Sequence, residues 1–237
     1  MSKRAAVAPV QDRARLSSSD HLVRDIVRGL YEGRFVAGQR LIEPDLMRLY
    51  NVSRSTVREA IKQLTAEGAV TQTAFRGAQV RHLSRQDARD VLQLLEVTIG
   101  LAARLAAENI NKDGMREPFL QAYETLTGFA EAADSFELVR ARNRFYRAMA
   151  RTGGNRELER LLPSFSVHLI RTHLKMPRRD RFADYRAMAE AILAGNPAAA
   201  EKAGRQHMQR TLDALDDAPD SIFAPAAPRQ TSFEDED

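Results

Sequence analysis

The chain has 237 residues, of which 43% are hydrophobic and 29% are charged, and it contains no cysteine. A chain of this length fits two modest domains, and the lack of cysteine excludes a disulfide framework and a cysteine-based zinc site. Because it has no apolar run of about 18 residues and no apolar signal core, we expect a soluble, cytoplasmic protein that does not enter a membrane.

The net charge of +4 is distributed unevenly along the chain. Residues 1–82 carry 14 Lys and Arg against 8 Asp and Glu, whereas residues 83–237 carry 22 against 24. Neutralisation of DNA phosphates requires a local basic excess of this kind. The first third of the chain therefore carries the charge that a DNA-binding element requires.

Residues 1–16 show no hydrophobic periodicity, and we expect them to form a flexible arm. Ser17-Ser-Ser-Asp20 then offers several N-cap residues, and the apolar positions between residues 22 and 31 have helical spacing. Gly33 follows as a helix-ending residue. This pattern predicts the first helix of a small N-terminal domain.

Two further helices are predicted close together. Residues 43–50 form a short amphipathic stretch, and only Asn51-Val52-Ser53 separates it from the next apolar-periodic run. In that run Val57, Ile61 and Leu64 fall on one face. Ser53 is placed as its N-cap, and Gly68 is placed as a C-terminal residue with positive φ. The spacing predicts a helix-turn-helix.

The opposite face of this second helix is basic and polar, with Arg54, Ser55, Arg58 and Lys62. A charged helix face is commonly a solvated surface and nothing more. Here, however, residues 69–80 form two β-prone runs around a turn at Arg76-Gly77, which predicts a hairpin directly after the helix. A helix-turn-helix followed by such a wing favours contact with DNA.

Residues from Ser84 onward predict helices only. Ser84 and Asp87 have capping-box spacing at the start of a long periodic run to about residue 110, which leaves 81–83 as a linker. Helical periods return at 115–132, 135–151, 156–174, 181–194 and 198–215, with breaks rich in Gly and Pro. The predicted fold is mainly α: a winged helix-turn-helix over 17–82, with three helices and a β-hairpin wing, then an all-α antiparallel bundle over 84–215. Residues 216–237 read as a disordered acidic tail.

The first of these domains resembles the winged helix of GntR-type bacterial transcription regulators. The resemblance covers residues 22–80 and rests on Gly38-Gln-Arg-Leu-Ile-Glu43, Val52-Ser-Arg-Ser-Thr-Val-Arg-Glu-Ala-Ile61, Glu67-Gly68 and Arg76-Gly77. Ala37 stands where the family usually has proline. The resemblance implies that the wing tip, at Arg76 and Gly77, enters the minor groove. It also implies that five residues face the major groove or its phosphates: Ser53, Arg54, Ser55, Thr56 and Arg58.

The second domain resembles the FCD effector-binding domain of the FadR-like branch, through residues 143–155, residues 184–200 and His207. Family members commonly hold a divalent metal there with an acidic or amide residue and three histidines. The corresponding positions in this chain are Arg142 or Asn143, then Tyr146, Tyr185 and His207. Only His207 keeps the histidine.

These substitutions change the chemistry that we expect of the site. A neutral phenol is a poor ligand for zinc or nickel. Arg142 and Tyr146 lie one helical turn apart, so with Asn143, Tyr185 and His207 they could bind a carboxylate or another anion directly.

Two alternatives to direct anion binding stay open. The tyrosines could pack in the core, as buried tyrosines commonly do. A zinc or nickel ion could instead be held by Asn143, His173 and His207, with His168 nearby on the same predicted helix as His173.

These features together predict a ligand-responsive transcription regulator, with a repressor as the commonest role in the family. We expect a homodimer on an inverted-repeat operator, with the 84–110 helix contributing to the dimer interface. The alternatives are an architectural DNA-binding protein without a ligand and an enzyme in the helical domain. The sequence has no P-loop, Gly-x-Ser-x-Gly or His-Glu-x-x-His motif, which disfavours the enzyme.

Overall fold

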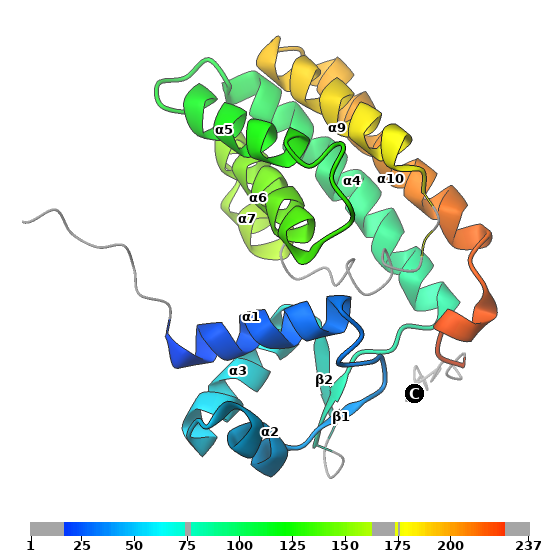
Figure 1. The fold of residues 1–237 in the computed structure, drawn as a ribbon. Helices are drawn as coiled ribbons and strands as arrows, with labels where there is room; N and C mark the ends of the chain where they lie inside the picture. Colours follow the sequence, from blue (N-terminus) through cyan, green and yellow to red (C-terminus); the bar gives the residue numbers. More distant parts are fainter. Residues whose placement is uncertain (1–16, 74–76, 163–173, 175, 226–237) are drawn as a thin grey trace, which may run out of the picture.

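The computed structural model describes residues 17–73, 77–162, 174 and 176–225. In this part of the chain, the N-terminal helices and a small sheet form one unit, and the longer helices form a bundle beside it (Figure 1). None of the described helices has both the length and the apolar character needed to cross a membrane.

The N-terminal unit packs three helices against a three-stranded antiparallel sheet. The helices are α1 (Ser18–Tyr31), α2 (Glu43–Tyr50) and α3 (Arg54–Ala66), and the strands are β1 (Arg40–Leu41), β2 (Val70–Thr73) and β3 (Gly77–Val80), in the order β1-β3-β2. β2 and β3 form the predicted hairpin, with Val70 opposite Val80 and Thr73 opposite Gly77. Burial of one apolar face of each helix stabilises the unit, and its core includes Leu22, Ile26, Val57, Ile61, Leu64 and Val70.

The helix ends of this unit follow from local sequence signals. The side chains of Ser17 and Ser53 accept hydrogen bonds from backbone amides of the first turns of α1 and α3. Asn51, with a φ of 49°, turns the chain after α2, and Gly68, with a φ of 67°, turns it after α3. Both φ values lie in the left-handed region that glycine and asparagine tolerate, so the short turn between α2 and α3 is encoded by residue type.

The bundle consists of α4 (Arg85–Asn109), α5 (Arg116–Thr127), α6 (Phe136–Gly153), α7 (Arg156–Leu161), α9 (Arg178–Leu193) and α10 (Pro197–Asp216). α4 is its central helix and packs against α6, α9 and α10. Glycines let α4 and α10 approach closely: a Cβ added to Gly204 would lie 3.1 Å from the carbonyl oxygen of Ile99. The predicted capping box is present, since Ser84 and Asp87 bond reciprocally at the start of α4.

Two helices predicted in this half of the chain end earlier in the structure. α5 ends at Thr127, several residues before the predicted end at 132. The predicted 156–174 helix is observed as α7, which ends at Leu161, and residues 163–173 lie outside the described part of the chain.

The segment 217–225 is ordered, although we expected it to belong to the disordered tail. It contains a 3-10 turn, η2 (Asp220–Ile222), and it packs against the start of α4. The reason is Arg85, whose guanidinium lies 2.8 Å from a carboxylate oxygen of Asp220 and 4.5 Å from the ring centroid of Phe223. Arg85 also donates to the carbonyl oxygen of Leu215 at 2.5 Å, which satisfies an acceptor at the end of α10. Residues 226–237 lie outside the described part.

Candidate DNA-binding surface and effector site

The exposed face of α3 carries the side chains that the sequence assigned to DNA. Arg54, Ser55, Arg58 and Lys62 are exposed, and Thr56 is half-buried. The opposite face, with Val57, Ala60, Ile61 and Leu64, is fully buried against the unit's core. The buried face thus fixes the rotation of the helix, and the basic side chains are held outward as a consequence.

Three hydroxyl groups gather at the N-terminus of α3. The side-chain oxygen of Ser53 lies 2.8 Å from that of Ser55 and 2.9 Å from that of Thr56. Amides and hydroxyls at the positive end of a helix dipole favour phosphate oxygens. This end of α3 therefore suits the DNA backbone, and the arginines on the following turns suit base edges or further phosphates.

Two acidic residues border this basic face. Nε of Arg58 lies 3.9 Å from Glu43, and the ammonium of Lys62 lies 3.9 Å from Glu59. The side chains of Arg58 and Lys62 are 66% and 69% exposed. Long, exposed ion pairs of this kind are worth little, so both cations can turn toward a phosphate.

The wing is formed by β2 and β3, and Gly77 begins β3 with a φ of 75°. A side chain there would be strained by the backbone conformation, which explains why the wing turn needs glycine. Arg76, the other residue assigned to the wing tip, lies outside the described residues.

In the bundle, a hydrogen-bonded chain connects three helices. The hydroxyl of Tyr146 on α6 lies 2.9 Å from Nε2 of His207 on α10, and Nδ1 of His207 lies 3.1 Å from Asp184 on α9. Arg210 donates to the other oxygen of Asp184 at 2.6 Å. His207 is fully buried, and the side chain of Asp184 is only 8% exposed. The structure thus brings Tyr146 and His207 together, as the resemblance implied.

Tyr185 also joins this group, through its ring. The ring centroid of Tyr185 lies 5.0 Å from that of His207 and 6.4 Å from that of Tyr146. Arg142, one turn before Tyr146 on α6, is buried, whereas Asn143 is exposed on the outer face of α6 and makes none of the contacts just described. Arg142 is thus held at a fixed, buried position one helical turn from Tyr146, and it is the positively charged candidate for anion recognition on α6.

Sequence reasoning missed Asp184 and Arg210. Asp184 directly precedes Tyr185, and Arg210 follows His207 by one helical turn. A signal was available, because an Asp among the buried positions of α9 needs a partner. Periodicity alone could not say which helix supplies that partner.

The α6 helix also contacts the N-terminal unit. A guanidinium nitrogen of Arg28 on α1 lies 3.6 Å from Glu137, and the same guanidinium lies 5.1 Å from the ring centroid of Phe136. At the end of α3, burial raises the pKa of Glu67, and the nearby positive charge of Arg147 opposes this rise. The helix that carries Arg142 and Tyr146 is thus in electrostatic contact with both α1 and α3.

The two units of the chain match two known protein families. Residues 18–80 match "Bacterial regulatory proteins, gntR family", and residues 87–210, more than half of the chain, match "FCD domain". The chain belongs to the GntR family of regulators with an FCD domain. These families and the named relatives are transcription regulators and not enzymes.

Two relatives of this GntR-family chain align with more than half of its length. It is 29% identical over 198 residues to the "Probable D-xylose utilization operon transcriptional repressor" of Paenarthrobacter nicotinovorans, which covers 81% of this chain and 86% of that protein. It is 24% identical over 144 residues to the uncharacterized HTH-type transcriptional regulator YdhC of Bacillus subtilis, which covers 60% of this chain and 64% of that protein.

Solved structures share the fold of this GntR-family chain. E. coli McbR/YncC matches with a TM-score of 0.67 at 18% identity, over 86% of this chain and 99% of that chain. A GntR transcriptional regulator from Rhodococcus sp. RHA1 matches with a TM-score of 0.68 at 20% identity, over 85% and 98% of the two chains.

The described side chains of this site do not supply the set of ligands that the divalent metal of FCD domains commonly has. No group of three His, Cys, Asp or Glu side chains within reach of one ion occurs among the described residues. His207 and Asp184 are the imidazole and carboxylate donors, and Tyr146 occupies the place beside them. His173, the third residue of the alternative metal set, and His168 lie outside the described residues.

Proposed function

We propose that this GntR-family regulator binds an inverted-repeat operator as a homodimer, acts as a repressor, and responds to a small anionic metabolite in its FCD domain. Two-fold protein symmetry suits a palindromic DNA site. The repressor named among its relatives favours the same role here.

The observation that carries this proposal is the two-sided α3 helix. Its apolar face is buried, its basic face is exposed, and its hydroxyl-rich N-terminus lies at the start of that face. In this proposal Arg54 and Arg58 contact base edges or flanking phosphates, with Ser53, Ser55, Thr56 and Lys62 around them, and Arg76 and Gly77 hold the wing.

Support for the effector part comes from the group around His207. Buried Arg142 supplies a fixed positive charge one turn from Tyr146, and Tyr185 packs on the His207 ring. A guanidinium can bind a carboxylate in bidentate fashion. In this proposal it replaces the charge that a metal would supply, while Tyr146, Tyr185 and His207 orient the ligand. Exposed Asn143 has no role in this arrangement.

The test of DNA recognition is a footprinting titration at fixed salt with Arg54→Ala and Arg58→Ala. Loss of a bidentate base contact should weaken operator binding by about 1–3 kcal/mol. Arg179→Ala serves as the control, because Arg179 is exposed on α9 in the bundle. Unchanged operator affinity in both α3 variants would contradict the assignment.

The effector test combines elemental analysis with a thermal-shift screen of small dicarboxylates on the parent and on Arg142→Met. The proposal expects a stabilising dicarboxylate that lowers operator affinity, and loss of that stabilisation in Arg142→Met with operator binding retained. About one zinc or nickel per chain, with a chelator-sensitive response, would contradict direct anion binding. A parent protein whose operator binding responds to no ligand would favour an architectural role.

A further inference from the structure

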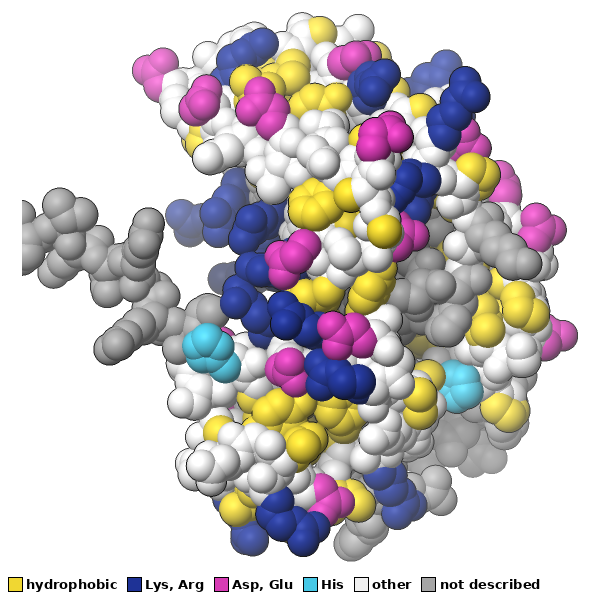
Figure 2. Space-filling view, in the orientation of Figure 1, with side chains coloured by type: hydrophobic (Ala, Val, Ile, Leu, Met, Phe, Trp, Pro, Cys, Tyr) yellow, Lys and Arg dark blue, Asp and Glu magenta, His cyan; other side chains and the backbone are white. Residues whose placement is uncertain are grey.

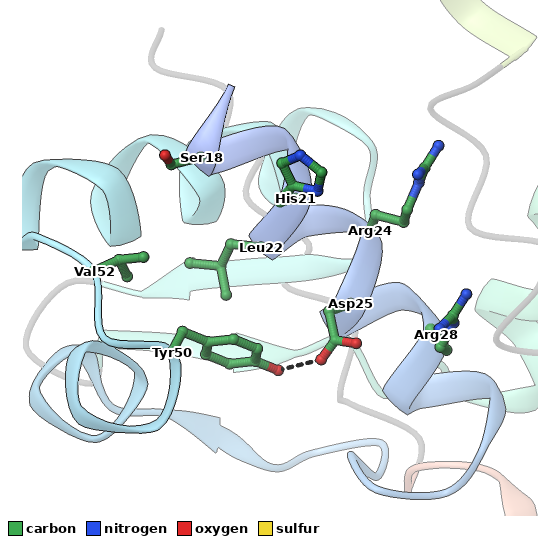
Figure 3. A pocket seen from close by; sticks show the side chains of 8 residues that line it. All are labelled: Ser18, His21, Leu22, Arg24, Asp25, Arg28, Tyr50 and Val52. Carbon is green, nitrogen blue, oxygen red and sulfur yellow. Dashed lines mark hydrogen bonds between the residues drawn. The ribbon is translucent and has the colours of Figure 1, made fainter. Parts of the chain in front are cut away.

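A groove with a volume of about 500 Å³ runs along α1 on the N-terminal unit (Figure 3). Its rim carries His21, Arg24 and Arg28, which lie on successive turns of α1. Its other wall is formed by Tyr50 at the end of α2 and Val52 in the turn before α3. On this side of the molecule, Lys and Arg side chains gather where the N-terminal unit meets the bundle (Figure 2).

The acid in this groove, Asp25, already has hydrogen-bond partners within the N-terminal unit. Asp25 accepts a hydrogen bond from the Tyr50 hydroxyl at 2.8 Å, and Arg34 donates to both of its carboxylate oxygens at 3.2 and 3.3 Å. Arg34 is shared with Glu32, 2.9 Å from it. Among the residues that line the groove, Arg24 and Arg28 outnumber Asp25, so the lining has a net positive charge.

The rim arginines are available to a ligand. Arg24 makes no hydrogen bond or ion pair with another described side chain, and Arg28 has an exposed ion pair with Glu137 at 3.6 Å and lies over the ring of Phe136. An exposed pair at this distance contributes little and exchanges readily for a stronger anion.

The arrangement of the cations favours a chain of phosphates over a single small anion. Pockets for small anions bring their polar groups together at one point. Here the cations are spaced along the helix, and a rise of 1.5 Å per residue places positions 21 and 28 roughly 10 Å apart. One strand of B-DNA presents about three phosphates over that axial length.

The groove also lies beside the DNA-facing end of α3. Val52 is part of its wall, and the next residue, Ser53, is the N-cap of α3. A DNA strand that borders the major groove at this end of α3 would continue into the groove along α1.

We propose that the α1 groove binds the sugar–phosphate backbone of the operator, with Arg24 and His21 as its phosphate-contacting side chains. This inference rests on the proposed DNA-binding function and adds a contact outside the recognition helix and the wing. Phosphate contacts fix the position of the protein on DNA and carry no base information, so this contact strengthens binding to every sequence alike.

The test measures the dissociation constant of the full chain for operator and unrelated duplexes over a range of salt concentrations. Arg24→Gln should reduce the slope of log K against log salt by about 0.9 for each N-terminal unit bound, and His21→Gln should weaken binding to both duplexes equally. Arg179→Gln on α9 is the matched control, since Arg179 is exposed and makes no hydrogen bond or ion pair with another described side chain. Its slope should equal that of the parent.

Three outcomes would overturn the inference. An unchanged slope in Arg24→Gln, with Arg54→Ala still losing operator discrimination, would show that α1 does not contact the DNA backbone. The proposed function would then remain supported. Thermal stabilisation of the parent by inorganic phosphate, lost in Arg24→Gln with the salt slope unchanged, would assign the groove to a free anion. A parent chain that binds neither duplex would overturn the proposed function together with this inference.

Discussion

The hydroxyl of Tyr146 and Nε2 of His207 lie 2.9 Å apart, so one hydrogen bond joins α6 to α10 inside the bundle. Its direction follows from Asp184, a carboxylate that also binds Arg210 and therefore accepts the Nδ1 proton of His207. In the neutral imidazole Nε2 is then an acceptor, and Tyr146 donates to it. A row of hydrogen-bonded polar groups thus connects α6 with α9 and α10.

Replacement of Asp184 by Asn should destabilise the bundle. The amide is uncharged, so Arg210 loses its carboxylate partner and the tautomer of His207 is no longer fixed. Breaking a buried hydrogen bond to a charged group should lower the free energy of unfolding by about 1–3 kcal/mol. Urea denaturation measures this, with Asp113→Asn in an exposed loop as the control. Equal denaturation midpoints for Asp184→Asn and the parent would show that the row is not stabilising.

Asp25 should contribute stability that disappears in acid. Burial raises its pKa, but the hydrogen bonds from Arg34 and Tyr50 outweigh burial and hold the pKa below its ordinary value of 3.8. A carboxyl group with a lowered folded-state pKa stabilises the protein above its ordinary pKa, and that contribution is lost as the pH falls through the folded-state value.

Asp25→Asn should therefore unfold more easily than the parent at pH 7, with the difference shrinking below about pH 4. The loss should be under about 1 kcal/mol, since the Asp25 side chain is 37% exposed. Thermal unfolding of both proteins over this pH range provides the measurement. A difference that stays constant down to the lowest pH would contradict the ionic explanation.

Glu67→Gln should stabilise the chain at neutral pH. Burial raises the pKa of Glu67 in the folded state despite the nearby Arg147, so ionisation of Glu67 costs folding free energy. Its charge also lies at the C-terminus of α3, where the helix dipole disfavours an anion.

The sign of the pH dependence at Glu67 is opposite to that at Asp25. The cost of ionisation grows as the pH rises from the ordinary value of 4.5 through the raised folded-state value, and it is absent below both. Glu67→Gln should thus melt at a higher temperature than the parent at pH 7.5 and at a similar temperature at pH 3.5. A lower melting temperature for Glu67→Gln at pH 7.5 would show that its charge is stabilising.

The dimer prediction concerns the exposed face of α4. Leu94 and Val97 are 57% and 49% exposed on this helix. They lie about one turn apart, so they form an apolar area that a partner subunit would cover. Leu94→Glu with Val97→Glu should shift the parent dimer toward monomer in light scattering at micromolar concentration. Leu49→Glu, at a 68% exposed position on α2, should leave the dimer intact. A parent that is monomeric and binds one half-site would exclude the dimer.

Short-range sequence patterns determined the N-terminal unit in detail. Ser53 caps α3, Gly68 ends it with a positive φ, and the apolar residues 57, 61 and 64 are buried while Arg54 and Arg58 are exposed. Each of these features depends on neighbours within about two helical turns, because capping, backbone preference and amphipathic periodicity are local effects. The predicted Ser84–Asp87 box at the start of α4 is of the same kind.

Only the tertiary structure decided which distant residues meet. Asp184, His207 and Tyr146 come from three helices, Arg85 orders a segment more than 130 residues away, and Arg28 reaches Glu137 across the two units. The sequence pattern of one helix does not specify which residues of another helix it will contact. Those contacts are set only when packing fixes the rotation and offset of each helix. The sequence thus shows that residue 85 is a charged arginine. Its contacts with residues 217–225 form only because the end of α10 lies beside the start of α4.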